Sequence, residues 1–261
     1  QIDAFTLAPS EKVAIVGPNG SGKTSLLRLL ALLERPTRWG RFVYRGRELP
    51  RGPGQRSPGS ERRGALGFLK QQPYLFAGTV RANLAYPLRL RRVPALERDR
   101  RVEAMLALVD LTALADAPVD RLSGGEQKRL ALGRVLIGNQ DLLLLDEPAA
   151  HLDRRSRRVI ERLLAESEAS WLLATHDLHL AHRLADRVLS LKSGRLAPAL
   201  PENVLEGRYE EDGLRTAGGL LIHLPPQEEV ARPDSGPAAA VMLDSRHVVL
   251  SLQPLASSMR T

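Results

Sequence analysis

Residues 17–25 combine glycines, a lysine and hydroxyl groups in an arrangement that can bind phosphate. The run reads Gly17, Pro18, Asn19, Gly20, Ser21, Gly22, Lys23, Thr24 and Ser25. Backbone N–H groups of such a loop surround an anion at the start of a helix, where the helix dipole adds favourable potential. We expect Lys23 to neutralise the β- and γ-phosphates and Thr24 to offer its hydroxyl to Mg²⁺. The alternative, a glycine turn that only happens to precede a lysine, is disfavoured by the completeness of the pattern.

Two carboxylates follow a strand-like run of leucines further along the chain. Asp146 and Glu147 come directly after residues 142–145, which are all leucine. Such a run is typical of a strand buried on both faces of a parallel sheet, so the carboxylates should emerge at the carboxyl edge of that sheet. We expect Asp146 to hold Mg²⁺ through water and Glu147 to act as general base for attack on a γ-phosphate. A carboxylate pair that only caps a helix is the alternative.

A second candidate anion site lies at residues 122–127, Leu-Ser-Gly-Gly-Glu-Gln. Ser123, Gly124 and Gly125 (the Ser-Gly-Gly segment) precede a run with helical periodicity, so their N–H groups can form another phosphate cradle at a helix N-terminus. The alternative is that Ser123 is only a good helix cap. Within one chain, an amphipathic helical segment separates these residues from the phosphate loop.

The order of these motifs is specific to one family. The phosphate loop is followed by Gln71, residues 122–127, Asp146-Glu147 and His176. In this order the chain resembles the ATP-binding subunit of an ABC transporter over about residues 1–200. The resemblance implies an ATPase that binds ATP with Mg²⁺ and drives a separate integral membrane permease from the cytoplasmic face of the cell membrane. In an importer, an extracytoplasmic solute-binding protein takes part indirectly.

The resemblance also implies roles for a glutamine and a histidine. Gln71 matches the glutamine that contacts Mg²⁺ and links the nucleotide to the transmembrane partner. The spacing to Pro73 favours Gln71 over the adjacent Gln72. His176 matches the switch histidine that contacts the γ-phosphate. A lone histidine at a strand end is more often an ordinary surface residue, so this role depends on the resemblance.

A head-to-tail homodimer is a further implication of the resemblance. Each ATP lies between the phosphate loop of one subunit and the Ser-Gly-Gly segment of the other. Asp153 belongs to the loop that crosses to the partner ATPase, and His151 departs from the family, which usually has a small residue there. The position at which the family stacks adenine on an aromatic residue falls before Gln1. Phe5 is too close to the phosphate loop for that role, so we expect it in the core.

Strands and helices alternate around these motifs, as expected for a parallel α/β sheet. The predicted strands are residues 11–17, 42–44, 65–69, 142–145 and 171–174, with a closing hairpin at 188–191 and 195–197. The predicted helices are residues 24–33, 97–111, 124–137, 156–166 and 178–185. With the resemblance, the predicted fold class is α/β. It has a P-loop (RecA-like) parallel sheet core, an antiparallel β subdomain and a helical subdomain, followed by a small β-rich extension.

Composition divides the chain into two parts. We predict an ABC ATPase domain at residues 1–198, with its helical subdomain at about 72–137. A run rich in Arg, Gly, Pro and Ser at 51–64 predicts a flexible surface loop within that domain. Prolines then interrupt short apolar runs throughout residues 199–261, which predicts the small β-rich extension.

Within the extension, residues 220–224 and 247–252 have the character of strands. Residues 244–261 resemble the opening of the small β domain of molybdate- and tungstate-type importers. The resemblance therefore implies a truncated regulatory domain and a transporter for molybdate or tungstate. Import of another small solute is the alternative.

Bulk composition constrains the remaining function classes. The formal net charge is +8, but arginines are spread along the chain and aromatic residues make up only 4%, so we expect no nucleic-acid partner. Cysteine is absent, which excludes disulfides and thiolate metal sites. No apolar stretch approaches the roughly 20 residues that span a bilayer, so another subunit must supply the path.

Two other classes of ABC protein are alternatives. An ABC ATPase acting on nucleic acid or ribosomes typically has a long coiled coil or a second phosphate loop, and the sequence contains neither. An inactive regulator would lack Lys23 or Glu147, and both are present.

Overall fold

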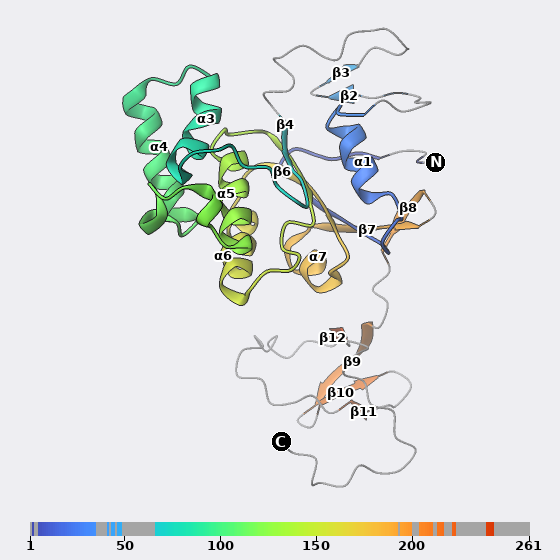
Figure 1. Cartoon of the computed structure of the whole chain (residues 1–261). Helices are drawn as coiled ribbons and strands as arrows, with labels where there is room; N and C mark the ends of the chain where they lie inside the picture. Colours follow the sequence, from blue (N-terminus) through green and yellow to red (C-terminus); the bar gives the residue numbers. More distant parts are fainter. Residues whose placement is uncertain are drawn as a thin grey trace, which may run out of the picture. The chain divides into compact units, whose positions relative to one another are not determined.

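The computed structural model describes residues 5–34 and 66–199 except Ser193. It also describes Ile2, Arg41, residues 43–44 and 46–48, and the backbone of four short strands after residue 203. The chain divides into two compact units, Gln1–Pro198 and Ala199–Thr261, and Figure 1 shows the elements of each. Among the described residues, no helix is long and apolar enough to cross a bilayer.

A six-stranded sheet lies at the centre of the first unit, in the order β4-β5-β6-β1-β7-β8. Its strands are β1 (Lys12–Val16), β4 (Leu66–Leu69), β5 (Leu142–Asp146), β6 (Ser170–Thr175), β7 (Arg187–Lys192) and β8 (Arg195–Pro198). All neighbouring strands are parallel except β7 and β8, which form an antiparallel hairpin. The predicted parallel α/β core is confirmed, and the carboxyl ends of β1, β5 and β6 meet at one edge.

Helices cover both faces of this sheet, because the central strands are apolar on both sides. α1 (Lys23–Leu30) places Leu27 in one buried cluster with Leu172 of β6. Side chains alternate between faces along a strand, so Trp171 points to the opposite face from Leu172. There Trp171 Nε1 donates to the carbonyl of Leu164 in α6 (Arg154–Ala165) at 3.2 Å. α7 (Leu178–Leu184) packs beside α6.

Three helices pack together beside the sheet (Figure 1). They are α3 (Val80–Leu90), α4 (Ala95–Leu108) and α5 (Gly124–Leu136), and the short 3-10 turns Thr112–Leu114 and Val119–Arg121 connect α4 to α5. Gly133 of α5 faces α3 and the C-terminal end of α4. A Cβ at Gly133 would lie 2.7 Å from Val109 and 3.3 Å from Leu84, so only glycine allows this packing.

Several element boundaries differ from the sequence predictions for identifiable reasons. The pattern does not predict α3 as a separate helix, because Pro87 lies inside it and proline usually ends helices. α1 ends at Leu30 rather than residue 33, since Leu32 has a left-handed φ of 58°. α4 ends at Leu108 rather than residue 111, since Asp110 has a φ of 57°. α6 begins at Arg154 rather than residue 156, because Asp153 caps it.

Two antiparallel sheets complete the described structure. β2 (Val43–Tyr44) pairs with β3 (Arg47–Glu48) in the first unit. The second unit has the strand order β11-β10-β9-β12, formed by β9 (Val204–Glu210), β10 (Gly213–Thr216), β11 (Leu221–Ile222) and β12 (Ala239–Met242). β11 lies within the predicted strand at 220–224, whereas β9, β10 and β12 are not predicted from the sequence. The predicted strand at 247–252 and loop at 51–64 lie outside the described residues.

Candidate nucleotide-binding site

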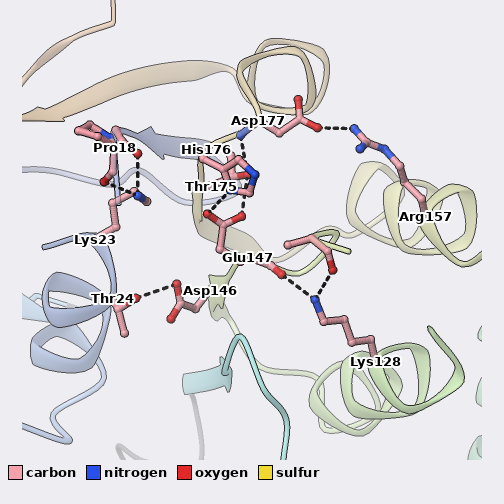
Figure 2. Close-up of polar contacts among 12 residues, drawn as sticks. Pro18, Lys23, Thr24, Lys128, Asp146, Glu147, Arg157, Thr175, His176 and Asp177 are labelled. Atoms are coloured by element: carbon pink, nitrogen blue, oxygen red, sulfur yellow. Dashed lines mark hydrogen bonds and ion pairs between the residues drawn. The ribbon is translucent and has the colours of Figure 1, made fainter. Parts of the chain in front are cut away.

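The phosphate loop joins the carboxyl end of β1 to α1 and curls around its own lysine (Figure 2). Lys23 Nζ donates to the carbonyl oxygens of Gly17 and Pro18 at 2.7 and 3.1 Å, and Lys23 is 7% exposed. Gly22 caps α1 with a φ of 100°, a left-handed backbone that favours glycine. The ammonium therefore lies inside the loop, where phosphate oxygens can replace the two carbonyls as its partners.

Thr24 and Asp146 bring a hydroxyl and a carboxylate together at the edge of the sheet. Thr24 Oγ1 donates to Asp146 Oδ1 at 3.1 Å, and Asp146 is 3% exposed at the end of β5. Burial raises the pKa of the Asp146 carboxyl, while the hydrogen bond from Thr24 opposes that rise. Mg²⁺ prefers oxygen ligands of this kind, and a divalent cation would offset the buried negative charge. These residues fit a magnesium ion bound together with a nucleotide.

Glu147 is held next to Asp146 by contacts to its side chain and its backbone (Figure 2). Its carboxylate accepts from Thr175 Oγ1 at 3.2 Å and lies 2.8 Å from His176 Nδ1. An imidazole N–H at Nδ1 can donate to the carboxylate at this distance. Glu147 also has a left-handed φ of 47°, and its N–H donates to the carbonyl of Ala174 at 2.9 Å. Backbone strain of this kind is concentrated at functional sites.

A cavity of about 430 Å³ joins these groups. It is lined by residues of the phosphate loop and of two further segments: Asn19, Gly20, Ser21, Gly22, Lys23, Thr24, Ser25, Gln71, Asp146 and Glu147. Gln71 follows β4 and lines the cavity, whereas Gln72 does not. His176 is not among the lining residues and reaches the cavity through its contact with Glu147. A cavity of this size and polarity can hold the phosphates of a nucleotide.

The Ser-Gly-Gly segment lies at the N-terminus of α5 and does not line this cavity. Ser123 Oγ accepts from the backbone N–H of Glu126 at 3.3 Å. The Glu126 carboxylate in turn accepts from the N–H and the hydroxyl of Ser123, both at 2.8 Å. The hydrogen bond from the Ser123 N–H, followed by that from its hydroxyl, lowers the pKa of the Glu126 carboxyl. Ser123 is thus a helix cap, and the rest of the first turn still offers N–H groups without intrahelical acceptors.

The N-termini of α5 and α6 meet beside this segment. Asp153 caps α6, with Oδ1 accepting from the N–H of Ser156 at 2.9 Å. A Cβ on Gly125 would lie 2.4 Å from Ser156 Oγ and 2.7 Å from Asp153 Oδ2. His151, two residues before Asp153, has a left-handed φ of 57°, a backbone conformation that favours glycine. Asp153 and the Ser-Gly-Gly segment therefore share one surface outside the cavity.

Comparison with known proteins identifies the family of this site. The family model described as "ABC transporter" matches residues 2–150, which include the phosphate loop, Gln71, the Ser-Gly-Gly segment and Asp146-Glu147. The chain belongs to the ABC transporter family. Its ATP-binding relatives are ATPases coupled to transport, so the chain is an ABC ATPase.

Two relatives and one solved structure show how far the similarity extends. The ABC ATPase is 39% identical to the phosphate import ATP-binding protein PstB 2 of Natronomonas pharaonis, covering 85% of this chain and 82% of the relative. It is 34% identical to the sulfate/thiosulfate import ATP-binding protein CysA of Thermosynechococcus vestitus, and this match covers 92% of this chain and 76% of the relative. A dimeric post-hydrolysis structure of the ATP-binding cassette MJ0796, bound to ADP and Pi, matches with a TM-score of 0.65 at 28% identity. That match covers 74% of this chain and 85% of MJ0796. The predicted resemblance to importer ATPases and the predicted fold are confirmed.

Two side chains of the ABC ATPase contact Glu147 but are not assigned from the sequence. Thr175 donates to the Glu147 carboxylate, and its position directly before His176 is a usable signal. Lys128 Nζ donates to the carbonyl oxygens of Glu147 and Ala150 at 3.2 and 2.6 Å (Figure 2). Lys128 lies in α5, distant in sequence from Glu147, and no local pattern indicates this contact. Phe5 packs against the core, as predicted.

The two glycines of the Ser-Gly-Gly segment should differ in their effect on stability. Gly125→Ala should lower the free energy of unfolding by about 1–3 kcal/mol, because the new methyl displaces Ser156 and Asp153. Gly124→Ala is the matched control, since a Cβ there meets no atom within 4 Å. Alanine is favoured over glycine in a helix by about 1 kcal/mol, so this variant should be as stable as the wild type or more stable. Urea denaturation measures both, and an equal loss in the two variants would contradict the packing argument.

Proposed function

We propose that this chain is the ATP-hydrolysing subunit of an importer, and that it dimerises head-to-tail around two ATP molecules to drive a separate membrane permease. One observation carries the proposal. Lys23, Thr24, Asp146 and Glu147 share one cavity, while the second anion cradle of the chain lies outside it. A second copy of the chain can supply that cradle, which completes the site.

Within one subunit, we assign the phosphates of ATP to residues 17–25, with Lys23 on the β- and γ-phosphates. Thr24, Gln71 and Asp146 are the groups proposed to hold Mg²⁺, Asp146 through water. When bound, the ion neutralises negative charge on the phosphates. Glu147 takes a proton from the attacking water, and the contacts from Thr175 and His176 fix the direction of its carboxylate.

Across the dimer, we assign Ser123, Gly124 and Gly125 to the γ-phosphate of the ATP bound by the partner. Their place at the start of α5 supports this role, because N–H groups and the helix dipole favour an anion there. Asp153 lies against Gly125 and caps α6, so it belongs to the same intersubunit surface. The ATPase domain is proposed to be residues 1–198, with α3 to α5 as its helical subdomain.

The proposed contact surface for the permease is an aromatic cluster that follows Gln71, made of Tyr74, Phe76 and Tyr86. The ring centroids of Phe76 and Tyr86 lie 4.4 Å apart and those of Tyr74 and Phe76 lie 5.6 Å apart. Tyr74 is 69% and Tyr86 is 40% exposed. Exposed aromatic residues are enriched at protein interfaces, and their place next to Gln71 connects this surface to the nucleotide cavity. Such a contact would hold the ATPase at the cytoplasmic face of the membrane.

Substitution in this aromatic cluster should separate transport from hydrolysis. Tyr86→Ser should leave ATP hydrolysis by the isolated chain within two-fold, because Tyr86 does not line the nucleotide cavity. Permease-dependent transport should fall by about 10-fold or more, since aromatic anchors often contribute ~2 kcal/mol at an interface. Leu108→Ser is the matched control, because Leu108 is 42% exposed at the end of α4 and outside the cluster. Equal transport losses in both variants would argue against this surface.

A tetrahedral oxyanion is the proposed solute. The sulfate/thiosulfate relative aligns with 92% of this chain, an extent that must include part of the second unit, and another relative imports phosphate. The resemblance of residues 244–261 to molybdate- and tungstate-type importers adds those two anions to the same chemical class. We propose residues 199–261 as part of a regulatory domain.

Reconstitution with a membrane permease that co-purifies with this chain tests the proposed function. Proteoliposomes containing both proteins should accumulate one of phosphate, sulfate, molybdate or tungstate only when ATP and Mg²⁺ are present on the side of the ATPase. The Glu147→Gln chain is the matched control. ATP-dependent release, or transport of none of these anions, would contradict the proposal.

A further inference from the structure

Lys128 connects the Ser-Gly-Gly segment to the backbone of Glu147. It lies one helical turn after Gly124 and Gly125 on α5, the helix that begins with that segment. From there its ammonium donates to the Ala150 carbonyl at 2.6 Å and to the Glu147 carbonyl at 3.2 Å (Figure 2). One side chain therefore joins the helix that bears the second anion cradle to both ends of the turn formed by residues 147–150.

This turn has a backbone that needs such support. Glu147 has a left-handed φ of 47°, and His151, just after the turn, has a φ of 57°. The N–H of Ala150 donates to the carbonyl of Glu147 at 3.3 Å, a distance typical of a weak bond. Left-handed non-glycine residues persist only where the surrounding structure holds them.

The surroundings of Lys128 suit a fixed contact rather than a mobile surface charge. Lys128 is half-buried, and burial lowers the pKa of its ammonium, while the negative charge of Glu147 opposes this shift. Backbone carbonyls are strong acceptors for an ammonium removed from water, and charge-assisted hydrogen bonds are stronger than neutral ones.

We infer that Lys128 is a positioning residue that makes Glu147 respond to occupation of the other ATP site of the dimer. The inference rests on the proposed function, in which the Ser-Gly-Gly segment binds the ATP of the partner. A movement of α5 that accompanies this binding is passed through Lys128 to the backbone of Glu147. The close packing of Gly125 on Asp153 and Ser156 links α5 to the far side of the same loop.

Lys128→Met removes both hydrogen bonds and keeps a long, unbranched side chain. The kcat for ATP hydrolysis should fall by about 10- to 100-fold, because a displacement of a catalytic group by about 1 Å has an effect of that size. The KM for ATP should stay within two-fold, since Lys128 does not line the nucleotide cavity. The Hill coefficient for ATP should fall towards one. Lys128→Arg should recover part of both kcat and cooperativity, because a guanidinium can donate to the two carbonyls again.

Lys12→Met is the matched control, because Lys12 Nζ also donates to a backbone carbonyl, that of Ala165 at 2.6 Å, away from the cavity. It should hydrolyse ATP with wild-type kcat and cooperativity. If Lys128→Met does not fold, Lys128→Gln serves instead, because the glutamine side chain is too short for its amide to reach both carbonyls. This variant should show the same loss of kcat and cooperativity.

The outcomes separate this inference from the proposed function. Wild-type kcat and cooperativity in Lys128→Met, with an inactive Glu147→Gln chain, would overturn the role of Lys128 alone. A Glu147→Gln chain with wild-type hydrolysis would overturn the proposed function itself. Equal losses of kcat and cooperativity in Lys128→Met and Lys12→Met would show that Lys128 only stabilises the fold, which would also overturn the inference.

Discussion

Glu147→Gln should stop hydrolysis and accumulate a dimer with ATP bound. The amide keeps the size of the side chain and can still accept from His176 and pair with the hydroxyl of Thr175, so the geometry around position 147 should be preserved. The amide cannot take a proton from water, and loss of a general base typically costs about 10²–10⁴-fold in rate. Because hydrolysis is the step that separates the subunits in this account, the dimer persists.

Gel filtration with ATP and Mg²⁺ is the measurement for this variant, together with phosphate release. The Glu147→Gln chain should elute as a dimer with ATP and as a monomer with ADP. Glu166→Gln is the matched control, since Glu166 is an exposed residue at the end of α6 and should leave hydrolysis unchanged. A Glu147→Gln chain that is monomeric with ATP and Mg²⁺ would count directly against the mechanism.

Lys23→Ala should abolish ATP binding. The ammonium is almost fully buried and already held by two carbonyls of the phosphate loop, so it is positioned to receive phosphate oxygens without a large rearrangement. Hydrogen bonds to charged groups contribute about 1.5–3 kcal/mol each, so losing two or more should weaken binding by at least about 100-fold. The two carbonyls also lose their donor, which adds local disorder to the loop.

Calorimetric titration with ATP measures this effect, and the melting temperature shows whether the variant is folded. Lys12→Met again provides the control, because it removes a lysine–carbonyl contact outside the cavity. If the Lys23→Ala chain bound ATP with wild-type affinity, the assignment of residues 17–25 as the phosphate loop would be wrong.

Much of the fold is predictable because its signals are local. The leucine run of β5 and the apolar residues of β1 have few alternatives to a buried strand, and the structure has both. The ends of helices depend instead on single residues with unusual backbone, such as Asp110 and Leu32, and the leucine gives no sequence signal for its positive φ. α3 illustrates a conflict of signals, since Pro87 opposes the helix while packing against α5 stabilises it.

The site is predictable in its residue types but not in its connections. The phosphate loop, Asp146 and Glu147 follow from composition and position along the chain. The contact of Lys128 in α5 with Glu147 after β5, and that of Gly125 in α5 with Ser156 in α6, arise only when segments separated in sequence meet in the fold. The sequence shows two anion cradles, and the structure adds that one of them lies outside the nucleotide cavity.

Mixing two inactive variants tests most directly whether each ATP site is formed by two subunits. One chain carries Lys23→Ala and keeps its Ser-Gly-Gly segment. The other carries Gly124→Asp, which places a negative charge where a γ-phosphate would bind, at a position with space for a side chain. Neither homodimer has an intact site, whereas a mixed dimer has one.

ATP hydrolysis after mixing is the measurement, with each chain alone as the control. We expect each chain alone to be inactive and the mixture to hydrolyse ATP, at a rate below that of the wild type because the other site of the mixed dimer cannot bind ATP. A mixture that hydrolyses no more ATP than the single chains would contradict a site formed by two subunits. Wild-type hydrolysis by the Gly124→Asp chain alone would also contradict it, because the site would then be complete within one chain.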